Sequence, residues 1–253
     1  MTSIDPRPAR NWFEQGGGDY ARFRPEYPSE LADFLASMAP DLRLAVDVGC
    51  GNGQLTRSLA SCFDRVVGLD PSADQIANAI PNERITYQCA PAEKLPMPDH
   101  SASLITAAQA AHWFDLHAFY QEVRRVGIAG GVLALISYGV LRLEPDLECR
   151  FQRFYWEEIA SYWPAQRKLV DEGYATMDFP FEEFEAPSME IRLEWDSSEF
   201  LGYLLTWSAV QHAREAGRMD VLNRFAEDIS ELWGDEHRRR SVAWPINIRV
   251  GRL

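Results

Sequence analysis

Apolar and polar positions alternate in a regular order along the first half of the chain. Short apolar runs have the length of buried strands, and they span 44–49, 65–70, 84–90, 101–109 and 132–139. Segments with apolar residues at helical spacing separate them, at 54–62, 71–80 and 115–126, after a first such segment that begins at Ser29. Strands and helices that alternate in this way predict a parallel sheet covered on both faces.

The alternation fades after Val140. Residues 141–187 are rich in Glu, Trp, Tyr and Phe and show helical patches without a strand run, which predicts a helical insertion. Further helical patterns lie at 197–210 and 220–233, and half-buried strand patterns lie at 189–195 and 241–253. Pro245 in the last of these indicates a bulge or an edge position.

These patterns together predict a single domain over residues 1–253. Its class is α/β: a Rossmann-like, doubly wound sheet, mostly parallel with one antiparallel closing strand, helices on both faces and a helical cap. The cap is the insertion at 141–187. A polar lead at 1–27, which contains three consecutive glycines, is expected to act as a lid that settles over the site.

Composition narrows the class of partner. The 253 residues carry a net charge of −13, which argues against nucleic acid or an anionic membrane as the main partner. No apolar run approaches the ~20 residues needed to span a bilayer, and no signal-peptide pattern is visible. The four cysteines form no CxxC pair and lack metal-ligand spacing, so we expect no metal. We expect a cytoplasmic protein, monomer or homodimer, that acts on a small molecule.

A glycine turn follows the first strand. Gly49, Gly51 and Gly53 alternate with Cys50 and Asn52, and Gln54 stands where a dinucleotide fingerprint has its last glycine. Glycines in this position allow positive φ and let a ligand approach the backbone. We expect the turn, with Cys50 and Gln54, to contact a nucleotide-like ligand.

Two carboxylates narrow the choice of ligand. Asp70 ends the second strand, where a carboxylate can take both hydroxyls of a ribose. That diol is common to a nicotinamide cofactor and to S-adenosylmethionine. Asp47, close to the glycine turn, would repel a diphosphate but suits a ligand with an amino group and a sulfonium. The sequence therefore favours S-adenosylmethionine.

The ordered set of motifs resembles the class I S-adenosylmethionine-dependent methyltransferases. The motifs are VDVGCGNGQ, VVGLDPSADQI and APAEKLPMPDHSASLITAAQAAHWFD, and the similarity is greatest to the small-molecule branch that includes the trans-aconitate methyltransferases. The lead YARFRPEYP and the late segment GYLLTWSA are also similar to that branch. The resemblance covers most of the chain and is weakest over 141–187.

The resemblance implies a set of cofactor contacts. Asp47, Gly49 and Gly51 should line the methionine and ribose end, and Asp70 should bind the ribose hydroxyls. The remaining positions that it implies are Pro71 and Ser72 beside the adenine, Ala92 and Glu93 at the adenine edge, Gln109 at the methionyl part, and Tyr20 and Arg24 in the lead that folds over the cofactor.

His112 is the candidate catalytic residue. It follows the fourth strand, at the carboxyl edge of the sheet where open α/β folds bind ligands. A carboxylate acceptor needs no base for methylation, whereas a phenol, alcohol or protonated amine does, and His suits that role. His112 could therefore act as a base, donate a hydrogen bond to the acceptor, or orient its loop. Trp113, Tyr138 and Trp207 are candidates for the wall of a largely apolar acceptor pocket.

The leading hypothesis is a methyltransferase (EC 2.1.1) that methylates a carboxylate or hydroxyl oxygen of a small molecule. N- or C-methylation of a metabolite is an alternative within the class. A nicotinamide-dependent oxidoreductase is a second alternative, against which Gln54 and the AAQAAHW segment count. A third is a binding module without catalysis.

Overall fold

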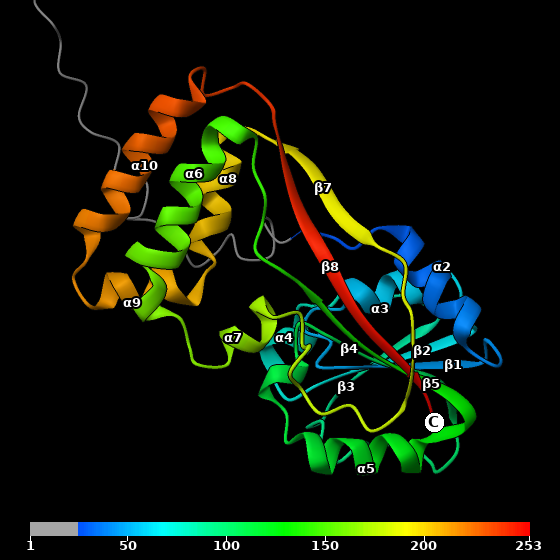
Figure 1. Ribbon diagram of the computed structural model, residues 1–253. Helices are drawn as coiled ribbons and strands as arrows, with labels where there is room; N and C mark the ends of the chain where they lie inside the picture. The colour runs from blue at the N-terminus through cyan, green and yellow to red at the C-terminus, as the bar shows by residue number, and fades with distance from the viewer. Residues whose placement is uncertain (1–24) are drawn as a thin grey trace, which may run out of the picture. The chain divides into compact units, whose positions relative to one another are not determined.

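The computed structural model describes residues 25–253, which divide into two compact units. The sheet unit comprises Glu26–Leu141, Ala165–Ile191 and Ala243–Leu253, and the helical unit comprises Arg142–Pro164 and Arg192–Val242 (Figure 1). Tyr20 and Arg24 lie outside the described residues. No helix within 25–253 has the combination of length and apolar character that a bilayer crossing requires.

Five parallel strands form the body of the sheet. They are β1 (Leu44–Val48), β2 (Arg65–Asp70), β3 (Ile85–Cys89), β4 (Ala102–Ala108) and β5 (Gly127–Tyr138). The strand order is β3-β2-β1-β4-β5-β8-β6. The chain thus crosses from one half of the sheet to the other between β3 and β4, which is the doubly wound arrangement.

The far side of the sheet is antiparallel. β8 (Arg240–Arg252) runs antiparallel to β5, and β6 (Glu182–Phe184) runs antiparallel to β8. β7 (Met189–Trp195) also pairs with β8. β6 therefore runs in the same direction as β1 to β5, and β8 is the expected antiparallel strand. The expectation of no strand within 141–187 was wrong. β6 is only three residues long and mostly polar, so it carries no apolar run that a pattern could detect.

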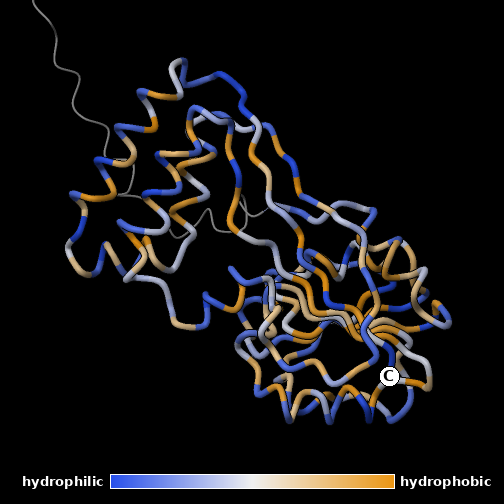
Figure 2. Tube along the Cα trace, in the orientation of Figure 1, coloured by the Kyte–Doolittle hydropathy of each residue, from blue (hydrophilic) through white to orange (hydrophobic). Residues whose placement is uncertain are grey.

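Helices cover both faces of the parallel strands. α2 (Ser29–Met38) and α3 (Gln54–Leu59) lie on one face, and α5 (Leu116–Val126) lies on the other (Figure 1). The short elements of the unit are α4 (Ala73–Ala77), η1 (Ala111–Trp113) and α7 (Arg167–Asp171). α5 begins where the Asp115 carboxylate accepts a hydrogen bond from the Ala118 N–H, and it buries Phe119, Val123 and Val126 against the sheet. Figure 2 shows the apolar strands enclosed between these helices.

The helical unit has its own core. Its elements are α6 (Pro145–Arg153), the π-helix η2 (Phe154–Glu158), η3 (Ala160–Tyr162), α8 (Ser197–Leu205), α9 (Ser208–Glu215) and α10 (Met219–Trp233). Phe154 stacks on Phe225 with ring centroids 3.8 Å apart. The buried Arg240 guanidinium bonds Asp146 at 2.7 Å and Glu144 at 3.0 Å. The unit therefore combines aromatic packing with a paired buried charge.

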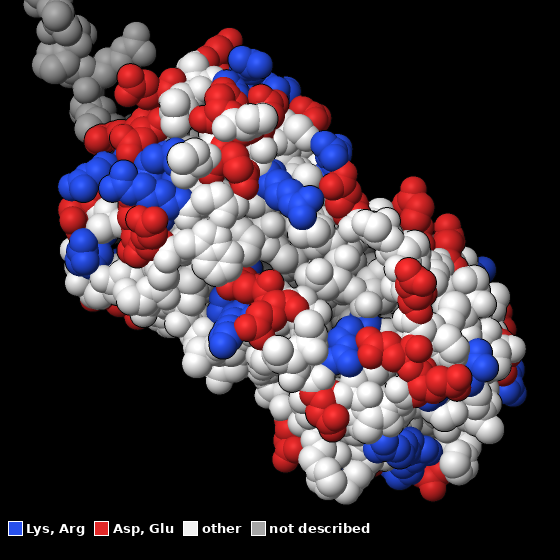
Figure 3. All heavy atoms as spheres, viewed as in Figure 1, with Lys and Arg blue, Asp and Glu red and all other residues white. Residues whose placement is uncertain are grey.

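Two boundaries differ from those expected. The helix predicted over 197–210 is interrupted at Trp207, whose backbone is extended at the start of α9. Of the segment 141–187, residues 142–164 belong to the same unit as α8 to α10, while residues 165–187 belong to the sheet unit. On the face drawn in Figure 3, acidic and basic side chains are interspersed, and no extended basic surface is seen there.

Candidate functional site

Several predicted site residues meet at one edge of the sheet unit. β1 lies between β2 and β4, so its carboxyl end is the point where the strand order reverses. Open α/β sheets bind ligands in the crevice outside such a point, because the loops that leave the two neighbouring strands diverge there. The glycine turn follows β1, Asp70 ends β2, and Gln109 follows β4.

The glycine turn is left-handed at all three glycines. The φ angles of Gly49, Gly51 and Gly53 are 70°, 55° and 87°. The N–H groups of Gly49 and Cys50 both donate to the carbonyl of Leu69, at 2.7 and 3.0 Å, which ties the turn to β2. A side chain at any of the three positions would be strained, since L-residues seldom adopt this conformation.

The three glycines differ in what surrounds them. A Cβ at Gly49 would overlap the Ala110 side chain, and one at Gly53 would overlap the Tyr87 hydroxyl. At Gly51, by contrast, the nearest heavy atom to a Cβ would be Gln75 Oε1 at 3.8 Å, an ordinary contact. Internal packing thus requires glycine at positions 49 and 53, whereas at position 51 it leaves room for a Cβ.

The Asp70 carboxylate holds the turn from the side of β2. Its Oδ2 accepts the N–H of Gly51 at 2.8 Å, and its Oδ1 accepts the N–H of Ser72 at 2.8 Å. Ser72 then caps α4, since its hydroxyl accepts the N–H of Gln75 at 3.3 Å. Pro71, between them, is exposed. Asp70 therefore holds both the glycine turn after β1 and the loop that follows β2.

Asp47 is buried beneath this turn. Its two oxygens accept hydrogen bonds from the hydroxyls of Thr56 at 2.7 Å and Thr106 at 2.8 Å. Burial raises the pKa of Asp47 from 3.8 to about 6, and the negative charge of Asp70 adds to this rise. Burial, with the charges of Asp47 and Asp70, also raises the pKa of the Cys50 thiol. Gln54 is half-buried at the start of α3.

Gln109 has an unusual backbone at the end of β4. Its φ is 54°, one of three non-glycine residues with positive φ within 25–253. Its side-chain amide donates to the carbonyl of Tyr138 at 3.1 Å. The ring of Tyr138 lies 6.1 Å from that of Tyr27, so the ends of β4 and β5 and the start of the described chain meet here.

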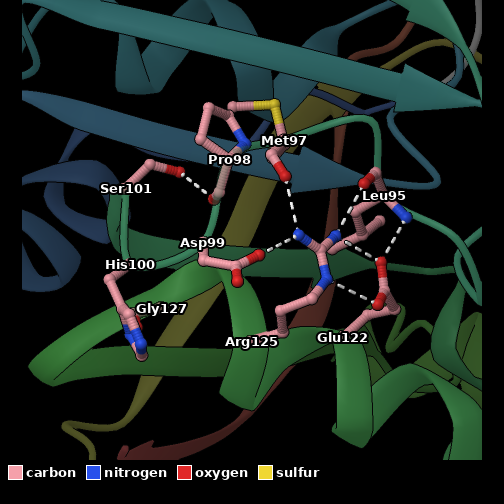
Figure 4. Close-up of polar contacts among 9 residues, drawn as sticks. All are labelled: Leu95, Met97, Pro98, Asp99, His100, Ser101, Glu122, Arg125 and Gly127. Atoms are coloured by element: carbon pink, nitrogen blue, oxygen red, sulfur yellow. Dashed lines mark hydrogen bonds and ion pairs between the residues drawn. The ribbon is translucent and has the colours of Figure 1, made fainter.

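The loop between β3 and β4 carries two further candidates. Ala92 is buried, and the Glu93 carboxylate accepts the N–H of Asp115 at 3.0 Å. Arg125 of α5 holds the rest of the loop (Figure 4), donating to the carbonyls of Leu95 and Met97 at 2.8 Å each.

The same guanidinium also binds carboxylates. Arg125 bonds Asp99 at 2.8 Å and both oxygens of Glu122 at 2.6 and 2.8 Å. The Glu122 Oε2 in turn accepts a hydrogen bond from the N–H of Leu95 at 2.7 Å (Figure 4). Arg125 and Glu122 of α5 therefore hold the loop together. Hydrogen bonds from Arg125 hold the pKa of Glu122 below its usual range.

His112 sits in η1, just past β4. Its Nδ1 lies 2.9 Å from the hydroxyl oxygen of Tyr174. Burial, aided by the positive charge of Arg167, lowers the pKa of His112 to about 4, so the ring is neutral near pH 7. The neighbouring Trp113 is 61% exposed, and its ring lies 4.9 Å from that of His112. A neutral imidazole beside an exposed indole can contact a ligand at this edge.

Trp207 belongs to the helical unit. It is buried in an aromatic cluster, with ring centroids 5.3 Å from Trp163, 5.5 Å from Tyr155 and 5.6 Å from Tyr203. Among residues 25–253, no group of three or more His, Cys, Asp or Glu side chains has the arrangement of a metal site.

Sequence reasoning missed three residues of this region. Tyr174 lies 62 positions after His112 and carries no motif. Thr56 and Thr106 hold Asp47 from α3 and β4, and neither spacing nor residue type marks them as its partners. The order of the strands gave a usable signal for Thr106, since adjacent strands β1 and β4 place it opposite Asp47.

Comparisons with known proteins show the family of this chain. A family model described as a methyltransferase domain matches residues 46–135, which contain the glycine turn, Asp70, Gln109 and His112. A Dictyostelium discoideum protein that carries the name of a methyltransferase is 35% identical over 239 residues, 92% of this chain and 91% of that protein.

A solved structure is also similar over nearly the whole chain. It is named for a type II methyltransferase of Anaeromyxobacter dehalogenans, with 44% identity and a TM-score of 0.85 over 90% of this chain and 97% of that one. The 27-O-demethylrifamycin SV methyltransferase of Amycolatopsis mediterranei is 31% identical over 140 residues, 51% of each chain. These similarities leave no support for the nicotinamide-dependent alternative. The chain belongs to the class I S-adenosylmethionine-dependent methyltransferases.

Proposed function

We propose that this chain binds S-adenosylmethionine at the carboxyl ends of β1, β2 and β4 and methylates an oxygen of a small-molecule acceptor. The acceptor oxygen belongs to a carboxylate or a hydroxyl group. When bound, the cofactor supplies a methyl group already activated on a positively charged sulfur. The observation that carries the proposal is the Asp70 carboxylate, which faces the glycine turn at the point where the strand order reverses.

The hydrogen-bonding capacity of the Asp70 carboxylate fits the ribose of the cofactor. Each oxygen of Asp70 accepts one backbone N–H, from Gly51 and from Ser72. A carboxylate has about four lone-pair sites, so two remain for the two hydroxyls of a ribose. A Cβ at Gly51 would make only an ordinary contact with Gln75, so the packing leaves room there that a ligand could use. The polar groups and the room thus support a bound nucleoside.

The local charge supports a cationic ligand. Asp47 and Asp70 lie close enough that the charge of Asp70 raises the pKa of Asp47. Two carboxylates so placed repel a diphosphate and attract a sulfonium and an amino group. Each oxygen of Asp47 already accepts a hydrogen bond, one from Thr56 and one from Thr106. In this proposal Asp47 therefore attracts the cofactor by its charge and supports the glycine turn, without a direct hydrogen bond to the cofactor.

We propose the same positions along the cofactor for the other contacts that the sequence predicts. Gly49, Cys50, Gly53 and Gln54 form the turn at the methionine and ribose end, and Gln109 faces the methionyl part. The adenine lies between two groups of residues, Pro71 and Ser72 on one side and Ala92 and Glu93 on the other. Tyr20 and Arg24 are proposed to close over the cofactor from the lead.

Several observations favour a small acceptor. The Amycolatopsis relative is named for a methyl transfer to an oxygen of a small molecule. The sequence also resembles the trans-aconitate methyltransferase branch, and we place the chain there. His112, Trp113 and Tyr138 of the sheet unit are proposed to contact the acceptor. The expectation that Trp207 also lines the acceptor pocket stays a prediction from the sequence. Methylation at nitrogen or carbon is the alternative outcome.

Calorimetric titration with S-adenosylmethionine and with its demethylated product tests the cofactor site. We expect Asp70→Ala to weaken binding at least tenfold, which is about 1.4 kcal/mol. Asp74→Ala, on the exposed side of the following helix, is the matched control and should bind as the native protein does. Unchanged affinity in Asp70→Ala would remove Asp70 from the site. Incubation with labelled cofactor and a metabolite extract, followed by mass identification of the product, identifies the acceptor atom.

A further inference from the structure

Tyr174 has a backbone conformation that a tyrosine rarely adopts. Its φ is 62°, and the preceding Gly173 has φ 63°. The conformation is held by its neighbours: the Tyr174 N–H donates to Leu169 at 2.8 Å, and Arg249 donates to the Tyr174 carbonyl at 3.0 Å. Arg249 is itself fixed by Glu183 at 2.8 Å. Strained residues that their surroundings hold in place cluster at functional sites.

This backbone places the Tyr174 side chain against His112. The residue is fully buried, and its hydroxyl oxygen lies 2.9 Å from Nδ1 of His112. Burial raises the pKa of Tyr174, so the phenol keeps its proton at any physiological pH. The hydroxyl is therefore always available as a hydrogen-bond donor.

The direction of the hydrogen bond follows from the partners of this hydroxyl. Because the hydroxyl belongs to a fully buried residue, its proton needs an acceptor within the protein, since a buried hydroxyl proton without a partner is unfavourable. Within residues 25–253, the hydrogen-bond partner of this hydroxyl is Nδ1 of His112. The proton therefore goes to Nδ1.

A neutral imidazole that accepts at Nδ1 carries its proton on Nε2. We propose that Tyr174 is a positioning residue that fixes His112 in the Nε2-protonated tautomer, so that His112 presents a hydrogen-bond donor and not a base. Two other histidines have the opposite arrangement. Nδ1 of His212 lies 2.9 Å from the Tyr162 carbonyl, and Nδ1 of His100 lies 3.2 Å from the Gly127 carbonyl. A carbonyl only accepts, so these two rings are protonated at Nδ1.

The tautomer narrows the acceptor class, on the condition that the proposed function is correct and His112 contacts the acceptor. A hydroxyl acceptor must lose a proton during methylation, and an Nε2 that already holds one cannot take it. A carboxylate loses no proton, and one of its oxygens can accept the Nε2 hydrogen while the other is methylated. The acceptor is therefore a carboxylate.

Nitrogen-15 NMR of histidine-labelled, cofactor-free protein tests the tautomer directly, with His112→Gln to assign the signal. We expect His112 to show an unprotonated Nδ1 and a protonated Nε2, with the reverse pattern at His100 and His212 in the same spectrum. A His112 that matches these two references overturns the proposal. Because no cofactor is present, this result does not depend on whether S-adenosylmethionine binds where we propose.

Tyr174→Phe tests the role of the hydroxyl, since the ring and its packing are kept. We expect mixed tautomers at His112, unchanged binding of the demethylated cofactor, and kcat/KM lowered by about two- to tenfold, as the net value of one hydrogen bond predicts. An unchanged tautomer in this variant overturns the role of Tyr174. Comparing carboxylic acids with alcohols and phenols as acceptors tests the last step, and methylation of a hydroxyl alone refutes it.

Discussion

Asp47 should make the stability of this protein depend on pH in an unusual direction. Its folded-state pKa is about 6, raised by burial from 3.8. Between these two values the folded state binds a proton that the unfolded state has lost, so the free energy of unfolding falls as pH rises through this window. Most carboxylates of folded proteins act in the opposite sense. Asp47→Asn removes the titrating group and keeps the shape of the side chain.

The magnitude follows from the two pKa values. A shift of about two units is about 3 kcal/mol for the complete titration. Between about pH 4.5 and about pH 7.5 the unfolding free energy should change by about 2 kcal/mol of this total. The remainder belongs to lower pH, where the unfolded chain takes up its proton at Asp47. The difference in unfolding free energy, Asp47→Asn minus native, should therefore be about 2 kcal/mol more positive at the higher pH.

Urea denaturation of both proteins across this pH range measures that difference. Taking the difference cancels the other titrating groups, whose contributions are common to both proteins. The hydrogen bonds of Thr56 and Thr106 to residue 47 change on substitution, but their contribution adds an offset that does not vary with pH. A difference that is constant across the range, or that changes in the opposite direction, would refute the reasoning that Asp47 is desolvated beneath the turn.

Two further predictions concern parts of the same region. Gly51→Ala should lower the free energy of unfolding by only about 1–2 kcal/mol, the cost of a left-handed alanine, but should weaken cofactor binding in calorimetry. Gly53→Ala should destabilise the protein more, because its Cβ overlaps the Tyr87 hydroxyl; equal stability of the two variants would contradict this. Arg125→Leu should lower the unfolding free energy by about 1–3 kcal/mol in urea titrations, since it leaves the loop carbonyls and Glu122 without their donor. The control is Arg218→Leu, which removes an exposed ion pair with Asp220 and should change the unfolding free energy little. A loss in the control as large as that in Arg125→Leu would count against the loop contacts.

The parallel half of the fold could be predicted because its determinants are local. The strand predicted at 65–70 is the observed β2, and the strand predicted at 101–109 is β4 to within a residue at each end. Buried strands need continuous apolar runs, and such runs are visible in a single sequence. Asp70 was selected as a candidate for the same reason, since it is the first polar residue after such a run.

The rest depends on contacts between distant segments. β6 is a strand only because β8 is beside it, and nothing in its three residues favours that state. Tyr174 reaches His112 through a turn set by Arg249, which is far away in the chain. His112 was identified as a candidate from its place after β4, but its tautomer depends on the residue that approaches it. No pattern of spacing contains that information.

The position of β8 has a consequence for the order in which the sheet assembles. β8 lies between β5 and β6, although it follows both in the chain. On a ribosome, β1 to β5 can pair as they emerge, whereas β6 has no neighbour until β8 has been synthesised and has docked. During that interval the outer edge of β5 is an open row of backbone donors and acceptors, the stage at which a nascent chain of this kind is most exposed to aggregation.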